Sequence, residues 1–154
     1  MTGHDDGVDL DIRAATAADD PERLFDLLWE LAPDDDRPPP PRLAAAWREI
    51  VAQPGRRVFL AERGPDLIGA VDTVVVPNLT RGARPFMLVE NVVVAAAHRR
   101  GGVASALFDT ALAWARERGC YKVQLLSNSR RDDAHHFYEK HGFAATAKGY
   151  RRYL

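Results

Sequence analysis

Hydrophobic and polar residues follow two periods along this chain, and each period predicts a different kind of element. Alternation over 8–13 predicts a half-buried first strand. Short apolar runs predict four further strands, over 57–62, 67–76, 86–94 and 122–126. Apolar residues spaced by three or four positions predict helices over 21–31, 42–53 and 103–118, and a capping box at Ser129-x-x-Asp132 predicts a fourth helix from 130 to about 141. The pattern indicates a mixed α and β protein organised around the buried run at 86–94.

Glycine and proline mark where these elements end. Four consecutive prolines, Pro38–Pro41, predict a stiff connector between the first two helices, because proline interrupts a helix and favours polyproline II. Residues 63–66 have the composition of a hairpin turn, and 77–85 that of a second turn. Gly119 and Gly142 are placed to end the last two helices.

The remaining segments complete one domain. Residues 1–7 are expected to form a disordered leader, and the tail over 143–154 predicts two last strands around Gly149. The predicted element order is βααβββαβαββ, without an internal repeat or a second domain. Residues 8–154 are therefore expected to form a single α+β domain.

Composition narrows the class of protein. The 154 residues are 46% hydrophobic and 28% charged, as in a soluble globular protein that buries a core. A net charge of −1 argues against a nucleic-acid binder that depends on a broad basic surface. The single cysteine, Cys120, excludes an intramolecular disulfide framework and is expected to be a buried, inert thiol. No membrane span or signal peptide is recognisable, so a cytoplasmic location without a membrane partner is expected.

Candidate chemistry concentrates between the central strand and the third helix. Two adjacent arginines, Arg99 and Arg100, precede Gly101 and Gly102 there. Glycine lets the backbone turn tightly and approach a ligand, and the first N–H groups of the following helix carry the positive end of its dipole. This arrangement predicts an anion site, most naturally for phosphate.

Two motifs carry a resemblance to a known family. Arg99-x-x-Gly102-x-Ala104 resembles the Arg/Gln-x-x-Gly-x-Gly/Ala signature of the GNAT superfamily, the acyl-CoA-dependent N-acyltransferases. The stretch Ala134-His-His-Phe-Tyr-Glu-Lys-His-Gly-Phe143 resembles that family's Ala-x-x-Phe-Tyr-x-x-x-Gly-Phe motif. Both occur in the family's order and spacing. The resemblance covers nearly the whole chain and implies a mixed, twisted sheet of about seven strands with helices on both faces.

The resemblance also implies an enzyme that transfers an acetyl group from acetyl-CoA directly to a primary amine, with both substrates bound together. The central strand would bind the pantetheine arm where it parts from the strand at 122–127, and Asn128 would bond an amide of the arm. Arg130 and Arg131 would reach the outer phosphate or else form a solvated helix start. The implied cofactor residues are Val92, Val93, Val94, Arg99, Arg100, Gly101, Gly102, Val103, Ala104, Ser105, Asn128 and Arg131.

Two side chains are candidates for proton transfer. Alternation places Glu90 on one face of the central strand with Val92 and Val94, in a partly buried setting, and makes Glu90 the candidate base for the amine. A backbone N–H near Val92 would polarise the thioester carbonyl. Tyr138 matches the second motif and is the implied proton donor to the CoA thiolate. The alternatives are a structural Glu90 paired to an arginine, and a Tyr138 that packs in the core.

Other features add less. The histidines lack the spacing of a metal site, so no metal is expected. The acidic connector at 34–36 forms a solvated loop or a rim that attracts a cationic amine. The acceptor is a small-molecule or peptide amine, and a homodimer is compatible with the resemblance.

Two other functions fit parts of the pattern. A non-catalytic acyl-CoA sensor would keep the glycine turn and the central strand. A dinucleotide-binding domain fits less well, because Gly-x-Gly-x-x-Gly is missing and only one βα unit lies among antiparallel signals.

Overall fold

The computed structural model describes residues 8–127 and 132–154. Its sheet has five strands, β1 (Leu10–Ala14), β2 (Arg56–Arg63), β3 (Asp66–Val76), β4 (Phe86–Val94) and β5 (Val123–Leu125). The α-helices are α1 (Pro21–Leu28), α2 (Pro40–Ala52), α3 (Thr80–Ala83), α4 (Val103–Glu117) and α5 (Asp132–Lys140). Two 3-10 turns, η1 (Trp29–Leu31) and η2 (Ala96–His98), follow α1 and β4. The predicted leader at 1–7 lies outside the described residues.

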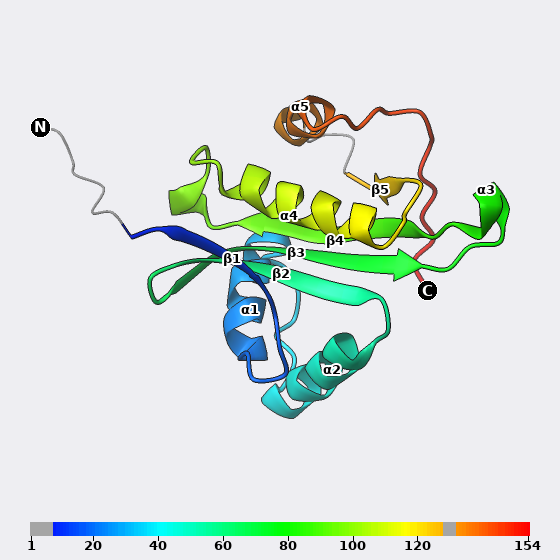
Figure 1. Ribbon diagram of the computed structural model, residues 1–154. Helices are drawn as coiled ribbons and strands as arrows, with labels where there is room; N and C mark the ends of the chain where they lie inside the picture. The colour runs from blue at the N-terminus through cyan, green and yellow to red at the C-terminus, as the bar shows by residue number, and fades with distance from the viewer. Residues whose placement is uncertain (1–7, 128–131) are drawn as a thin grey trace, which may run out of the picture.

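Strands that follow one another in sequence are also neighbours in the sheet. β1 to β4 pair antiparallel, while β5 runs parallel to β4 after the crossover through α4. The hairpin between β2 and β3 turns at Gly64 and Pro65, as predicted. The sheet is therefore mixed, which confirms the α+β fold class (Figure 1).

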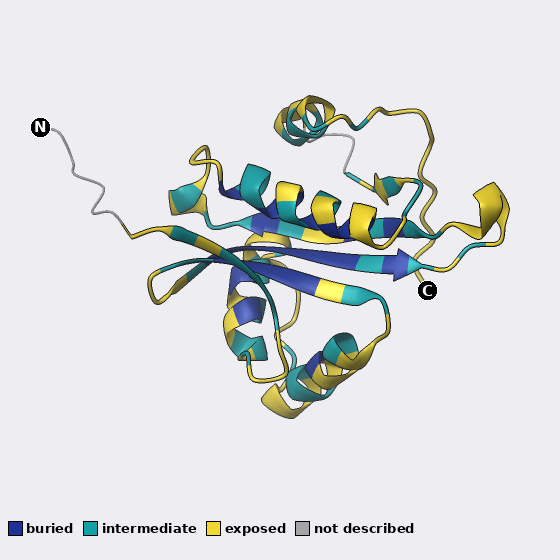
Figure 2. Cartoon of the chain, viewed as in Figure 1, coloured by how far each residue is buried: buried dark blue, intermediate teal, exposed yellow. Residues whose placement is uncertain are grey.

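Helices cover both faces of the sheet, as expected. α1 and α2 lie on one face and α4 on the other, with α5 beyond α4 (Figure 1). On the α4 face, Val103, Leu107 and Phe108 pack on β3 and β4 in the larger core. On the opposite face, Leu24 and Trp47 pack in a smaller core. Figure 2 shows buried residues along the central strands and on the helix faces turned toward them.

Local sequence explains where the helices begin and end. The Asp20 carboxylate accepts the N–H of Glu22 at 2.9 Å and caps α1, with Pro21 in the first turn. α2 begins at Pro40, earlier than predicted, because proline in the first turn lacks only an N–H that the helix does not use. Gly119 follows α4 with φ +72°, the left-handed conformation expected after a helix.

The tail differs from the prediction. The described residues after α5 form no strand, so the sheet has five strands rather than about seven. The reason is geometric: a strand pattern becomes a strand only beside a free edge, and the tail crosses the end of β5 instead of following it. An ideal Cβ on Gly149 would lie 2.8 Å from Leu126 Cδ2, just beyond β5. The turn over 77–85 also contains the short helix α3.

Candidate active site

The site begins where β4 and β5 part. Met87–Val89 pair with Val123–Leu125, and β4 then continues to Val94 with no described strand along that edge. A cavity of about 570 Å³ lies at this opening, lined by Leu31, Val92, Val93, Val94, Arg99, Asp132, Asp133 and Ala134. The structure therefore brings together four of the residues predicted to bind a cofactor. Unpaired backbone groups on the β4 edge need hydrogen-bond partners, and an amide-rich extended ligand supplies them.

A β-bulge interrupts β4 at this opening. Asp72 of β3 lies opposite Glu90 and Ala70 lies opposite Val93, so Asn91 and Val92 together face one residue of β3. Asn91 has φ +50°, a left-handed conformation that asparagine adopts more readily than most residues. Because of the bulge, side chains after Asn91 point to the opposite face of the sheet from the one expected for a regular strand.

The bulge corrects the prediction for Glu90. Val92 and Val94 pack against the core on the α4 face, whereas Val93 packs on the opposite face. Glu90 shares a face with its cross-strand partner Asp72, so it does not lie on one face with Val92 and Val94. Its side chain is also exposed rather than partly buried. Within the described residues Glu90 forms no ion pair with an arginine or lysine.

A buried ion pair lies beside Glu90. Asp72 is only 7% exposed, and its carboxylate accepts a hydrogen bond from Arg56 Nε at 3.0 Å and a second from the Arg56 Nη2. These hydrogen bonds raise the pKa of Arg56, so the guanidinium stays charged. Arg56 thus provides hydrogen-bond donors for the buried Asp72 carboxylate and links β2 to β3. Of the carboxylates of Asp72 and Glu90, that of Glu90 is the more accessible to solvent.

The turn before α4 has the geometry of an anion site. Arg100 has φ +64° and Gly102 has φ +81°, and α4 starts at Val103. An ideal Cβ on Gly102 would meet nothing within 4 Å, so the space beside this glycine is open. The first N–H groups of the helix have no acceptor within the helix and carry the positive end of its dipole. The bend and the cavity together suit a ligand that combines a pyrophosphate with an extended amide-containing arm.

Arg99 makes contacts that the sequence did not predict. Its Nε donates to the carbonyl of Val94 at 3.1 Å, and its Nη2 lies 3.2 Å from Glu30 Oε2. The same Glu30 oxygen accepts the N–H of Ala96 at 3.1 Å. The carboxylate of Glu30, in η1, thus contacts both the Arg99 guanidinium and the backbone at the start of η2. Sequence reasoning missed Glu30 because 66 residues separate it from Ala96.

Tyr138 lies among aromatic rings on α5. Its ring centroid is 5.8 Å from that of Phe108 and 6.1 Å from that of Phe143, and the residue is half-buried. Ala134, one helical turn earlier on the same face, lines the cavity. Tyr138 therefore packs as a core aromatic residue does. It lies on the same face of α5 as Ala134, which lines the cavity.

Some predicted site residues cannot be placed relative to the cavity. Asn128, Arg130 and Arg131 lie outside the described residues.

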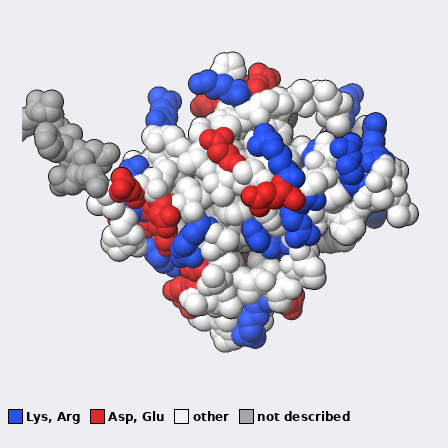
Figure 3. Space-filling view, in the orientation of Figure 1, with Lys and Arg blue, Asp and Glu red and all other residues white. Residues whose placement is uncertain are grey.

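Cys120 is half-buried, and burial raises the pKa of its thiol, which makes it a poor nucleophile as expected. In the parts of the chain that the structure describes, no helix is long and apolar enough to cross a membrane. Acidic and basic residues are interspersed over the face shown in Figure 3.

Comparison with known proteins identifies the family. Residues 22–143 match the sequence model of the Acetyltransferase (GNAT) family, which is well over half of the chain. The chain belongs to this family. A solved structure of a candidate acetyltransferase from Agrobacterium tumefaciens str. C58 is 33% identical with a TM-score of 0.88, covering 94% of this chain and 99% of the other. A transcriptional regulator from Bacillus halodurans C-125 is 29% identical with a TM-score of 0.85, covering 95% and 100%.

A curated relative matches over a shorter region. The glucosamine 6-phosphate N-acetyltransferase of Trypanosoma brucei brucei is 35% identical over 89 residues. The match spans 58% of this GNAT chain and 58% of that relative's length. The family assignment confirms the resemblance that the two sequence motifs carried.

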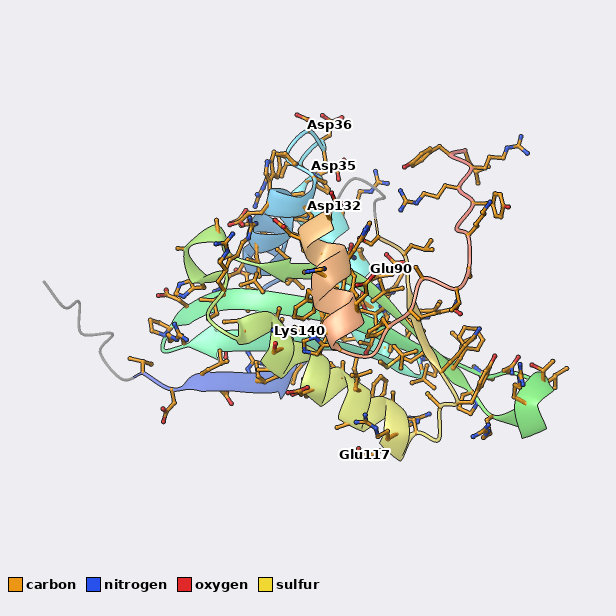
Figure 4. The ribbon with its side chains drawn as sticks, turned by 90° about the horizontal axis from the view of Figure 1, so that it is seen from above. Asp35, Asp36, Glu90, Glu117, Asp132 and Lys140 are labelled. Carbon is orange, nitrogen blue, oxygen red and sulfur yellow. The ribbon has the colours of Figure 1, made fainter. Side chains whose placement is uncertain are left out.

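The lining of the cavity adds residues that the GNAT motifs did not predict. Leu31 comes from η1, and Asp132 and Asp133 come from the start of α5. Seen from above, Asp35 and Asp36 lie at the same edge of the molecule as Asp132 (Figure 4). The sequence suggested the acidic residues at 34–36 as a rim that attracts a cationic amine. It did not suggest Asp132 and Asp133, because their position at the cavity depends on how the chain crosses over to α5.

Proposed function

We propose that this protein transfers the acetyl group of acetyl-CoA to a primary amine of a small-molecule or peptide acceptor. The observation that carries the proposal is the combination of a parted β4 edge, which lines a cavity together with Arg99, and a glycine turn that follows Arg99 directly in the chain. A peptide-like arm bonds to the free edge of β4, and a pyrophosphate binds the helix N-terminus. Acetyl-CoA supplies the activated thioester and needs no metal.

The cofactor is held mainly by backbone groups. The amides over 100–105 receive the pyrophosphate, and Val92–Val94 receive the arm. The guanidinium of Arg100, at the bend, adds positive charge for the phosphates. Arg99 adds a second positive charge when its guanidinium turns from the Glu30 carboxylate to the phosphates. A backbone N–H near Val92, at the bulge, polarises the thioester carbonyl. Because the bulge turns this part of β4 away from regular pairing, its polar groups are available to a ligand.

Glu90 and Tyr138 carry the proton transfers in this proposal. A protonated amine cannot attack a thioester, so Glu90 takes its proton, directly or through water. Exposure of Glu90 leaves its carboxylate accessible to an acceptor amine, while the acyl donor lies along the unpaired edge of β4. The amine then attacks the carbonyl carbon, the carbon–sulfur bond breaks, and Tyr138 protonates the departing thiolate.

A cationic acceptor fits the surroundings of the cavity. Asp132 and Asp133 line it, and Asp35 and Asp36 project at the same edge (Figure 4). Acidic side chains attract a polyamine or an amino sugar and repel a phosphate group. We therefore propose an unphosphorylated amine, in contrast to the phosphorylated sugar in the name of the curated relative.

Release of free thiol from acetyl-CoA tests the proposal directly. The acceptor panel contains glucosamine and glucosamine 6-phosphate as a matched pair, together with spermidine, an aminoglycoside and a peptide with a free amino terminus. Acetylated product is identified by mass. We expect turnover of at least one amine and a lower KM for glucosamine than for its 6-phosphate. A preference for the phosphorylated sugar would overturn the acceptor proposal and leave the reaction intact.

A non-catalytic acyl-CoA sensor is the second candidate. It is favoured by the likeness to a chain named as a transcriptional regulator, over 95% of this chain. Both functions predict that CoA, and not NAD, raises the melting temperature. They differ in the thiol assay, because a sensor binds acetyl-CoA without consuming it in the presence of any amine.

A further inference from the structure

A second cavity lies between α4 and β2, apart from the cavity at the β4 edge. Its volume is about 460 Å³, and the two cavities share no lining residue in the described part of the chain. It is lined by Arg57, Phe59, Asp109, Thr110, Ala113, Trp114 and Glu117. None of the described residues given a role in acetyl transfer lines it, so the proposed reaction does not account for this cavity.

The deepest part of this cavity is apolar. Phe59 and Trp114 are each only 4% exposed, and their rings pack edge to face with centroids 5.9 Å apart. Ala113 continues the apolar lining along α4. A hydrocarbon chain that lies against these side chains leaves water without covering a polar group, which favours binding.

One end of the cavity is cationic. The Arg57 guanidinium lies over the Trp114 ring, 4.9 Å from its centroid, and the Arg118 guanidinium lies 5.9 Å from the same centroid. Contact with the ring orients a guanidinium and leaves its planar N–H fork able to bind a carboxylate. Among the residues that the structure describes, Arg57 forms no ion pair. This end therefore suits a carboxylate.

The other end presents two oxygen acceptors on α4. Asp109 is exposed and has no cationic partner within the described chain. The Thr110 hydroxyl donates to the carbonyl of Ala106 at 3.0 Å, so its oxygen can still accept a hydrogen bond. A carboxylate beside a hydroxyl oxygen suits a protonated amine. Five residues separate Asp109 from Trp114, which places them about 7.5 Å apart along the helix axis.

A molecule with opposite charges at its two ends matches this cavity. We propose that the cavity binds a linear zwitterion, with its carboxylate on Arg57 and its ammonium group on Asp109 and Thr110. Its hydrocarbon chain packs against Trp114. Extended 6-aminohexanoate separates its charges by about 7.5 Å, at about 1.25 Å per bond, which matches the spacing of the two ends. A polyamine is repelled by Arg57, and a dicarboxylate is repelled by Asp109.

Chemical shifts test the class of ligand and its position together. In nitrogen-15-labelled protein without CoA, we expect 6-aminohexanoate to shift the amide signals of Thr110 and Trp114. Hexanoate and hexylamine each lack one charge and should bind at least about tenfold more weakly, because each loses a charge-assisted contact. Glycine is too short to join the two ends and should bind as weakly.

Three outcomes of this titration would overturn the proposal. One is the absence of any shift at Thr110 and Trp114 with 6-aminohexanoate. Another is equal affinity for hexanoate or hexylamine, because one end would then contribute nothing. The third is a set of shifts confined to Val92–Val94, which would place the amine at the cavity proposed for acetyl transfer. Because the titration contains no CoA, none of these outcomes depends on the proposed reaction.

Two variants and a matched control assign the ends. Arg57→Gln should weaken 6-aminohexanoate at least about tenfold and leave hexylamine unchanged, and Asp109→Asn should weaken it similarly and leave hexanoate unchanged. Both residues are exposed, so the far-ultraviolet circular dichroism should not change. If either variant fails to fold, the ligand series in the wild-type protein still decides. Wild-type affinity in both variants would overturn the proposal.

Glu117→Gln is the control, because it removes another negative charge from the same lining. Glu117 follows Asp109 by eight residues, about 12 Å along α4, and lies beyond the reach of an ammonium group held at Asp109. The variant should bind 6-aminohexanoate at least as tightly as the wild type does. A loss of affinity equal to that of Asp109→Asn would overturn the proposed orientation of the ligand.

Discussion

Glu90 and Glu117 are both exposed glutamates, but they lie in different surroundings. Glu90 follows the paired part of β4 and lies opposite Asp72, whereas Glu117 ends α4 at a distance in Figure 4. If Glu90 is the base, Glu90→Gln should lower kcat about 100-fold or more without changing the Kd for acetyl-CoA, because only proton removal is lost. Steady-state kinetics and calorimetric titration measure the two effects.

The matched variant for this prediction is Glu117→Gln. It removes the same charge from another exposed position and should leave both constants unchanged. A Glu90→Gln enzyme with wild-type kcat across the pH range would remove Glu90 from the role of base.

Glu30 provides a prediction about affinity. The Arg99–Glu30 pair is exposed, so it contributes little stability, but it occupies the Arg99 fork that a phosphate would use. Glu30→Gln keeps an oxygen for the Ala96 N–H and removes the competing charge. We expect CoA to bind about two- to fivefold more tightly to this variant, by calorimetry. Glu22→Gln, whose partner is Arg37, is the control, and weaker CoA binding by Glu30→Gln would show that Glu30 positions Arg99 instead.

Tyr138 is expected to act in the chemical step. Tyr138→Phe keeps the ring that packs on Phe108 and removes the hydroxyl, so folding should change little. The single-turnover rate with saturating acetyl-CoA should fall about tenfold or more. Tyr121→Phe supplies the comparison, and an unchanged single-turnover rate in Tyr138→Phe would exclude the donor role.

Among the elements, the turn before α4 makes the sharpest prediction. Gly102→Glu places a bulky carboxylate at the positive end of the helix, where a phosphate would bind. CoA affinity should fall at least about 100-fold. Gly82→Glu is a close control, because Gly82 also has positive φ, at +72°, and nothing within 4 Å of an ideal Cβ. Tight CoA binding by Gly102→Glu would mean that the bend does not hold the phosphates.

Elements were predictable where their cause is local. The β2–β3 hairpin, the cap at Asp20 and the glycine after α4 follow from side chains a few residues apart. The bulge at Asn91 was not predicted, because an asparagine within an apolar run adopts a strand conformation as readily as a left-handed one. That single residue reversed the face predicted for Glu90. The two tail strands failed for a different reason, because strand pairing depends on the path of the tail relative to β5, which the apolar pattern of the tail does not determine.

At the scale of the whole molecule, the site depends on two separate cores. One core lies between the sheet and α4 and supports the bend, and the other lies beneath α1 and α2 and supports the Leu31 side of the cavity. The motifs at 99–104 and 134–143 were sufficient to predict the family and the glycine turn before α4. The other lining residues of the cavity were not predictable, because Leu31 comes from η1 and Asp132 and Asp133 come from α5, which only the folded chain brings to one cavity.

The network around Arg13 predicts how the free energy of unfolding depends on pH. Arg13 on β1 donates to Asp19, before α1, and to Glu62 on β2, with Nη2–Oδ1 and Nε–Oε2 distances of 2.6 and 3.0 Å. Hydrogen bonds from Arg13 lower the pKa of Asp19, although burial opposes them. In the unfolded chain this carboxyl titrates near its ordinary value of about 3.9. A lowered folded pKa means that the stabilisation is complete above that value and is lost as the pH falls through the folded pKa.

Asp19→Asn isolates this contribution, because all other groups titrate alike in both proteins. Urea unfolding should show the variant less stable by roughly 1–2 kcal/mol at pH 7, with the difference shrinking as the pH falls below the ordinary aspartate pKa of about 3.9 and through the lowered folded pKa of Asp19. Asp11→Asn, on the exposed side of β1, should show no such difference at either pH. A stability difference for Asp19→Asn that is the same at both pH values would show that the carboxylate's hydrogen-bond geometry, and not its charge, holds α1 to the sheet.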